Sequence, residues 1–103
     1  MKMKIKKIKE GTSLTLEVEG RLETTTAPEL ATVVKEELGG VENLVFDFEK
    51  VEYISSTGLR VLLFAQKEMN KRGTMKIINV SDEVYDVMQD VGFTGISEIY
   101  KKE

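Results

Sequence analysis

Three neighbouring hydroxyl side chains, Ser55, Ser56 and Thr57, form the part of the sequence best suited to carry chemistry. They precede Gly58 and lie between an apolar segment, 44–54, and a helical pattern that starts at Leu59. Loops at the carboxyl ends of strands are where α/β proteins place many of their sites. Serine and threonine also cap helices routinely, so simple capping competes with a functional role.

Catalysis by one of these hydroxyls is not supported by the rest of the sequence. The chain has no histidine and no cysteine, which removes the commonest general base, the thiol nucleophile and the usual zinc ligands. The segment also lacks the G-x-S-x-G pattern of a nucleophilic serine and the G-x-x-x-x-G-K-[ST] pattern of a phosphate-binding loop. We expect no catalytic residue, no cofactor and no bound metal.

Carboxylates offer a weaker chemical signal. Asp47, Glu49 and Glu52 follow a predicted strand, where a pair could serve acid–base or metal chemistry, although solvated loop charges are the simpler interpretation. A small enzyme would be indicated by a deep pocket holding at least two of the four residues Asp47, Glu49, Glu52 and Ser56. A further acidic group, Glu83, Asp86 and Asp90, shares one face of a predicted helix and is either a partner surface or only solubilising.

Length and charge limit the class of protein. The 103 residues carry 15 Lys and Arg against 18 Asp and Glu, giving a net charge of −3, which argues against nucleic-acid binding. The longest uninterrupted apolar run is 61–65, far shorter than a membrane span, and the first ten residues have no apolar signal-peptide region. We expect one domain over residues 1–103, in the cytoplasm, with no membrane insertion.

Periodicity predicts the elements that position residues 55–57, called the hydroxyl loop below. Met1, Met3, Ile5 and Ile8 alternate imperfectly with lysines, Leu14, Leu16 and Val18 alternate strictly, and a hairpin turn at 10–12 joins these two strands. The lysines suit an exposed sheet edge. Helices follow at about 26–38, 59–72 and 82–91, and strands at 44–48, 75–80 and 96–100. The order β-β-α-β-α-β-α-β predicts an α/β domain: a mixed sheet of four to five strands with helices packed against it.

Local signals add detail to this prediction. Gly20 is expected to end the second strand, and Thr26 with Glu29 forms a Thr-x-x-Glu capping box for the first helix. The apolar run 44–48 suggests a strand covered on both faces. Ser81 is expected to cap the last helix. Its inner face should hold Val84, Val87, Met88 and Val91.

Two motifs give the chain a family resemblance. Leu44-Val45-Phe46-Asp47-Phe48, followed by Ser55-Ser56-Thr57-Gly58-Leu59, resembles the apolar strand and Asp-Ser-Ser/Thr-Gly-Leu signature of the STAS domain of bacterial anti-sigma-factor antagonists. Gly20-Arg21-Leu22-Glu23 resembles the Gly-x-Leu-Asp turn before that family's first helix. The resemblance covers nearly the whole chain.

The resemblance implies a modification site and a partner surface. In the family, the serine after the motif's Asp is phosphorylated, and that position is Ser56, with its neighbours Thr57 and Ser55 as alternatives. Two positions depart from the pattern, because Ser55 and Glu23 stand where the family has Asp. The implied partner-binding residues are Glu23, Thr24, Ser55, Ser56, Thr57, Gly58 and Leu59.

The resemblance also implies a function. The expected protein is not an enzyme but a monomeric transcription regulator that binds an anti-sigma factor, itself a serine kinase, and so frees a sigma factor. Phosphorylation would stop this binding and a serine phosphatase would restore it. The alternative is a stand-alone STAS subunit of a membrane transporter or of a stress-sensing assembly.

Overall fold

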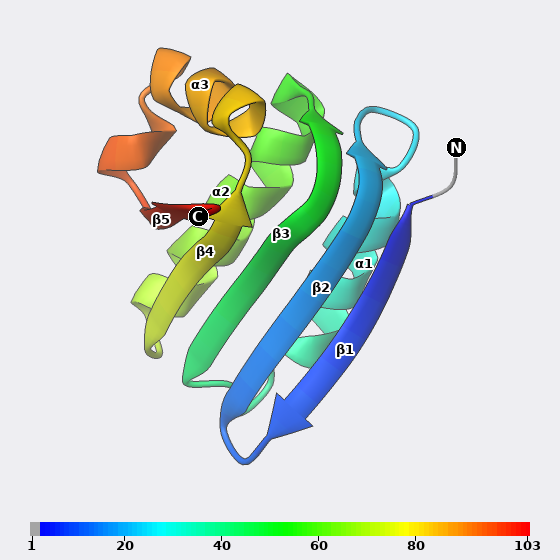
Figure 1. Cartoon of the computed structure of the whole chain (residues 1–103). Helices are drawn as coiled ribbons and strands as arrows, with labels where there is room; N and C mark the ends of the chain where they lie inside the picture. Colours follow the sequence, from blue (N-terminus) through cyan, green and yellow to red (C-terminus); the bar gives the residue numbers. More distant parts are fainter. Residues whose placement is uncertain (1–2) are drawn as a thin grey trace.

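The strands of the computed structural model, which describes residues 3–103, form one mixed five-stranded sheet in the order β1-β2-β3-β4-β5. Strand β1 runs antiparallel to β2, and β2 to β5 are parallel neighbours (Figure 1). The elements in chain order are β1 (Lys4–Glu10), β2 (Ser13–Leu22), α1 (Ala27–Glu37), β3 (Asn43–Ile54), α2 (Ser56–Asn70), β4 (Thr74–Val80), α3 (Asp82–Asp90), the 3-10 turn η1 (Phe93–Gly95) and β5 (Glu98–Lys101). The predicted α/β fold and element order are confirmed. Residues 1–2 of the predicted first strand and domain lie outside the described residues.

The N-terminal hairpin forms as its pattern predicts. Gly11 adopts a φ of 60°, a conformation that suits glycine, in the turn between β1 and β2. Leu14, Leu16 and Val18 are buried on one face of β2. Strand β1 lies at the edge of the sheet, and its lysines are exposed, which protects the edge from pairing with other chains.

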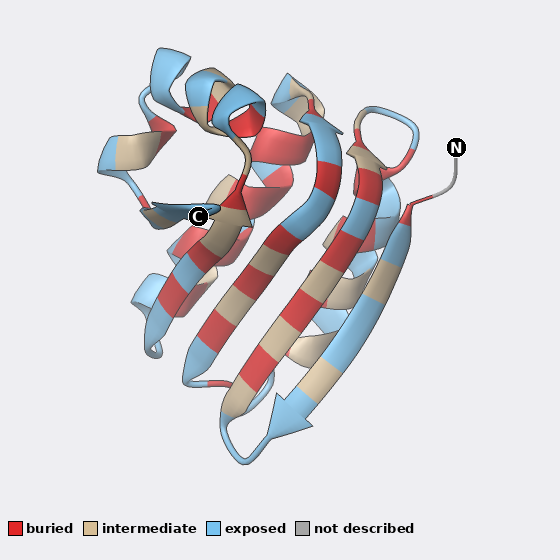
Figure 2. Cartoon of the chain, in the orientation of Figure 1, coloured by how far each residue is buried: buried red, intermediate tan, exposed pale blue. Residues whose placement is uncertain are grey.

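Helices α1 and α2 cover one face of the sheet, and the other face is uncovered over β1 to β3 (Figures 1 and 2). Along β3, Leu44, Phe46 and Phe48 are buried whereas Val45 and Asp47 are only half-buried. The prediction that this strand is covered on both faces is therefore wrong. Parallel strands that follow one another in sheet order, joined by right-handed crossovers, place their helices on the same side.

The carboxyl ends of β2 and β3 lie side by side, with Leu22 next to Ile54. Strand β2 continues through Gly20, which has a φ of 108° beside a shift in strand register, and ends at Leu22, so the predicted strand end at Gly20 is wrong. Strand β3 reaches Ile54, and the amide of Ser55 donates to the Leu22 carbonyl oxygen at 2.9 Å. The hydroxyl loop after β3 is thereby fixed to the turn after β2.

Helix α3 begins as predicted, with the Ser81 hydroxyl accepting a hydrogen bond from the amide of Val84 at 3.2 Å. Val84 and Met88 are buried, but Val87 is half-buried and Val91 is 59% exposed. The inner face of α3 is therefore narrower than expected, because the helix ends at Asp90 and Val91 follows it.

Candidate functional site

The three hydroxyls of the loop have different roles. Ser55 is the N-cap of α2: its backbone is extended, and its Oγ accepts a hydrogen bond from the amide of Gly58 at 3.3 Å. The capping interpretation thus holds for this residue. Thr57 lies in the first turn of α2, with its Oγ1 3.2 Å from Oγ1 of Thr24, so this pair joins the start of α2 to the turn before α1.

Ser56 differs from both neighbours. It is the first residue of α2 and is exposed, and within residues 3–103 its hydroxyl has no hydrogen-bond partner. Ser56 is therefore the hydroxyl of the loop that is presented to solvent without a local structural role.

Gly58 and Leu59 position the loop from its core side. Both are buried, and Leu59 belongs to the hydrophobic core. A β-carbon at Gly58 would meet Leu22 and Ile54, so only glycine allows α2 to start this close to the ends of β2 and β3. Their burial means that these two residues shape the site without presenting side chains to a partner.

The turn after β2 is held by Thr26. Its Oγ1 donates to the Arg21 carbonyl oxygen at 2.7 Å and accepts from the amide of Glu23 at 2.9 Å. The predicted capping box with Glu29 is wrong, because the Thr26 side chain makes no cap hydrogen bond to α1. The side chain turns back to the preceding turn, where it satisfies backbone groups that would otherwise be unpaired.

Charged and aromatic side chains flank the loop. Glu23 pairs with Arg21 at 3.4 Å, and the Arg21 guanidinium lies over the Tyr53 ring, 4.4 Å from its centroid. The sequence interpretation included Glu23 and missed Arg21, Tyr53 and Arg60. The spacing of Arg60, one helical turn after Ser56, was a signal in the sequence, whereas the pairing of Arg21 with Tyr53 is visible only in the register of β2 and β3.

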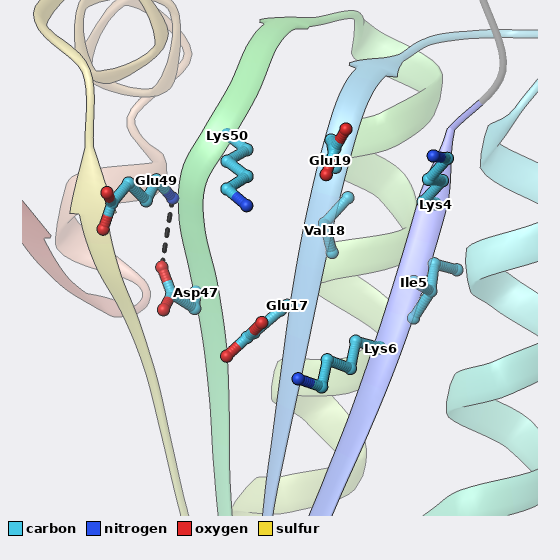
Figure 3. Close-up of a pocket in the computed structure, with 9 residues that line it drawn as sticks. All are labelled: Lys4, Ile5, Lys6, Glu17, Val18, Glu19, Asp47, Glu49 and Lys50. Carbon is cyan, nitrogen blue, oxygen red and sulfur yellow. Dashed lines mark hydrogen bonds between the residues drawn. The ribbon is translucent and has the colours of Figure 1, made fainter.

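A hollow of about 670 Å³ lies on the open face of the sheet (Figure 3). Two of the predicted carboxylates, Asp47 and Glu49, line it together with three lysines, whereas Glu52 and Ser56 are not among its lining residues. Asp47 has a structural role, since it accepts hydrogen bonds from the Glu49 amide and from the Asn79 side chain, both at 3.1 Å. The hollow is a surface of mixed charge, separate from the hydroxyl loop.

Residues 3–103 contain no group of three or more His, Cys, Asp or Glu side chains placed to hold a metal ion. They also contain no helix with the length and apolar character needed to span a membrane.

The family model for the STAS domain matches residues 3–103. The search of curated protein sequences found no match.

Solved structures share the fold at low sequence identity. An anti-sigma factor antagonist from Mycobacterium paratuberculosis is 18% identical, with a TM-score of 0.87 over 95% of this chain and 85% of that one. The phosphorylated form of the Bacillus cell-fate determinant SpoIIAA is 17% identical, with a TM-score of 0.66 over 94% and 89%. A sulfate transporter family protein from Wolinella succinogenes is 22% identical, with a TM-score of 0.76 over 90% and 80%.

Proposed function

Because the chain belongs to the STAS domain family, we propose that it is an anti-sigma-factor antagonist controlled by phosphorylation of Ser56. The unphosphorylated form binds an anti-sigma factor that is also a serine kinase, and this binding frees a sigma factor. The kinase then phosphorylates Ser56 and the complex dissociates. A serine phosphatase returns the chain to its binding form.

The observation that carries this proposal is the contrast among the three loop hydroxyls. Ser55 and Thr57 are engaged in hydrogen bonds with Gly58 and Thr24, whereas Ser56 is exposed at the start of α2. A kinase needs an accessible hydroxyl that can enter its active site, and it supplies the base, the metal and the nucleotide itself. This favours Ser56 over both neighbours as the acceptor.

The surface around Ser56 fits partner contact. Thr24 is exposed and Glu23 is half-buried, and the Thr24–Thr57 contact places this turn next to the first turn of α2. We assign direct contact to Glu23, Thr24, Ser56 and Thr57. Ser55, Gly58 and Leu59 hold the loop in shape.

Charge explains how a single phosphate acts as a switch. A phosphoserine adds about −1.5 to −2 charges at pH 7, to a chain whose net charge is −3. The partial positive charge of a helix N-terminus tolerates this within the domain, so the fold is retained. A docked partner, in contrast, has to bury or face the dianion, which costs several kcal/mol. A loss of about 3–4 kcal/mol lowers affinity by a factor of about one hundred to one thousand.

Phosphorylation is tested by incubating the chain with its cognate anti-sigma kinase and ATP and locating the phosphate by mass spectrometry. We expect one phosphate on Ser56, none on Ser56→Ala, and normal labelling of Ser55→Ala and Thr57→Val. A phosphate on Ser55 or Thr57 of the Ser56→Ala variant would show that Ser56 is not the sole acceptor. No labelling of the wild-type chain would reject the phosphorylation switch.

The charge mechanism is tested by calorimetric binding to the same kinase. Ser56→Ala should bind like the wild type, and Ser56→Asp should bind at least tenfold more weakly. Thr12→Asp is the matched control, since it places the same charge on the exposed β1–β2 turn, at the opposite end of the sheet (Figure 1). Equal binding by Ser56→Asp and Thr12→Asp would contradict the mechanism.

A second candidate function follows from the likeness to the sulfate transporter family protein. In this alternative the chain is an accessory STAS subunit of a membrane transporter or of a stress-sensing assembly, and Ser55 in place of the family Asp fits such a divergence. A pull-down from the source cell separates the two functions. Recovery of an anti-sigma kinase supports the first function, and recovery of a transporter subunit supports the second.

A further inference from the structure

A groove with an apolar lining runs between α1 and α2. Its volume is about 370 Å³, and its floor is formed by Ala27 and Ala31 from α1 and by Val61 and Phe64 from α2. Phe64 remains 36% exposed although it is a large apolar side chain. Thr57 also lines the groove, so the groove is continuous with the loop that carries Ser56. The chain thus leaves apolar surface uncovered directly beside its proposed phosphorylation site.

The charges of this groove have one sign. Among the described residues, its charged lining side chains are Lys35 and Arg60, and no carboxylate lines it. Both cations are exposed, and neither forms an ion pair with any residue in the range 3–103. The Lys35 ammonium lies 5.7 Å from the centroid of the Phe64 ring, and this contact leaves its charge available to an anion. The groove is therefore apolar along its floor and positive along its rim.

We propose that this groove binds an acidic amphipathic helix of the anti-sigma partner, an assignment that rests on the proposed function. Apolar side chains of the helix fill the space over Ala31, Val61 and Phe64, and flanking carboxylates pair with Lys35 and Arg60. From Ala27 to Lys35 helix α1 rises about 12 Å, which matches about two turns of a docked helix. Carboxylates on the helix are required because the rim offers only positive charge.

The groove also gives the phosphate a second way to release the partner. Ser56 and Arg60 are four residues apart on α2, with the acidic group nearer the N-terminus, which is the favourable arrangement for an ion pair on a helix. A phosphate on Ser56 attracts the Arg60 guanidinium and withdraws one of the two cations that the acidic helix needs. Arg60 thus pairs with a carboxylate of the partner before phosphorylation and with the phosphate afterwards.

A synthetic peptide tests the groove without any natural partner. The probe is a helical peptide with leucines at i, i+3, i+4 and i+7 and glutamates beside them, and its control carries lysines in place of the glutamates. Titrated into the ¹⁵N-labelled full chain, the acidic peptide should shift the amide signals of Ala31, Arg60 and Phe64. An absence of shifts, or equal shifts with the lysine peptide, would overturn the proposal.

Charge reversal on the chain sharpens the result. Lys35→Glu and Arg60→Glu should each lower the affinity for the acidic peptide at least tenfold. Lys76→Glu is the matched control, because this exposed lysine lies between the buried Met75 and Ile77 of β4 and so points to the face opposite the core. Folding of each variant is verified from the unperturbed signals of the core. Loss of binding by Lys76→Glu to the same extent would mean that overall charge, and not the groove, determines affinity.

The anti-sigma kinase itself distinguishes failure of the groove from failure of the proposed function. If the kinase binds wild type and the Lys35→Glu/Arg60→Glu variant equally, the groove proposal is overturned and the proposed function stands. If the acidic peptide binds the groove as expected but no anti-sigma factor binds the chain, the docking chemistry is supported and its assigned partner is rejected.

Discussion

Gly58 lies so close to Leu22 that a β-carbon on the glycine would be 2.7 Å from Leu22 Cγ and 3.0 Å from the Leu22 carbonyl oxygen. This contact joins the first turn of α2 to the end of β2. The carbonyl cannot shift freely, because it accepts the hydrogen bond from the amide of Ser55. The position of the hydroxyl loop therefore depends on residue 58 being a glycine, which has no β-carbon.

Substitution of Gly58 by alanine should destabilise the domain. Overpacking costs about 1–3 kcal/mol, and the better helix propensity of alanine recovers at most about 1 kcal/mol. Urea unfolding of Gly58→Ala should show the loss. Gly39→Ala is the control, since among residues 3–103 no atom beyond its chain neighbours lies within 4 Å of its added β-carbon. If both variants are equally stable, the close contact does not constrain the loop.

The buried hydroxyl of Thr26 is expected to stabilise the turn after β2. Thr26→Val keeps the shape of the side chain but removes the hydroxyl, which donates to the Arg21 carbonyl oxygen, lies 3.3 Å from the Glu23 carbonyl oxygen and accepts from the Glu23 amide. Leaving these groups unpaired should lower the free energy of unfolding by about 1–3 kcal/mol. Thr26→Ser should retain most of the stability. Thr25→Val, at an exposed neighbour, is the control, and an equal loss there would argue against a specific role.

Ser55, which the resemblance to the STAS signature aligns with an Asp, caps α2. Ser55→Ala should lower the free energy of unfolding by about 1 kcal/mol, because the Gly58 amide loses its acceptor. Ser55→Asp should be as stable as wild type, since aspartate caps equally well and its charge suits the helix N-terminus. Denaturant unfolding of the three proteins tests this order. An alanine variant of undiminished stability would show that the 3.3 Å contact is unimportant.

The sequence predicted the element order because its hydrophobic periods are clear. Strict alternation in 14–18 and helical spacing in 59–69 each reflect one buried face, which is a local property. The prediction that β3 is covered on both faces failed because Val45 is apolar but lies on the open face, between the buried Leu44 and Phe46. The three residues therefore read as one continuous apolar run. A short apolar run does not show how many faces are covered.

Contacts outside the short motifs explain the other differences at the site. The Thr-x-x-Glu pattern at Thr26 predicted a cap on α1, but the hydroxyl donates instead to the Arg21 carbonyl oxygen, five residues earlier in the turn after β2. The distinction among Ser55, Ser56 and Thr57 depends on Gly58 and Thr24, and Thr24 is far away in sequence. The groove likewise exists only once α1 and α2 lie side by side.

Tyr100 offers a prediction about titration. Its hydroxyl donates to Glu98 Oε1 at 3.1 Å, and this hydrogen bond, together with the carboxylate charge, raises the pKa of Tyr100 above its ordinary value of 10.0. Both effects favour the protonated phenol, so Glu98→Gln should lower this pKa towards 10.0. NMR titration of labelled tyrosine measures it, with Glu10→Gln as a remote control. An unchanged pKa in Glu98→Gln would exclude this cause.

A buried hydrogen bond should couple α2 to the segment before β5. The Ser97 hydroxyl donates to Gln66 Oε1 at 2.6 Å, and both residues are buried. Ser97→Ala leaves the Gln66 oxygen unpaired, and Gln66→Met leaves the hydroxyl unpaired, so each should cost about 1–3 kcal/mol of unfolding free energy. The double variant removes both groups and should lose less than the sum, by about 0.5–3 kcal/mol. A double-mutant cycle from urea unfolding measures this coupling, and strictly additive losses would show that the two side chains stabilise the domain independently.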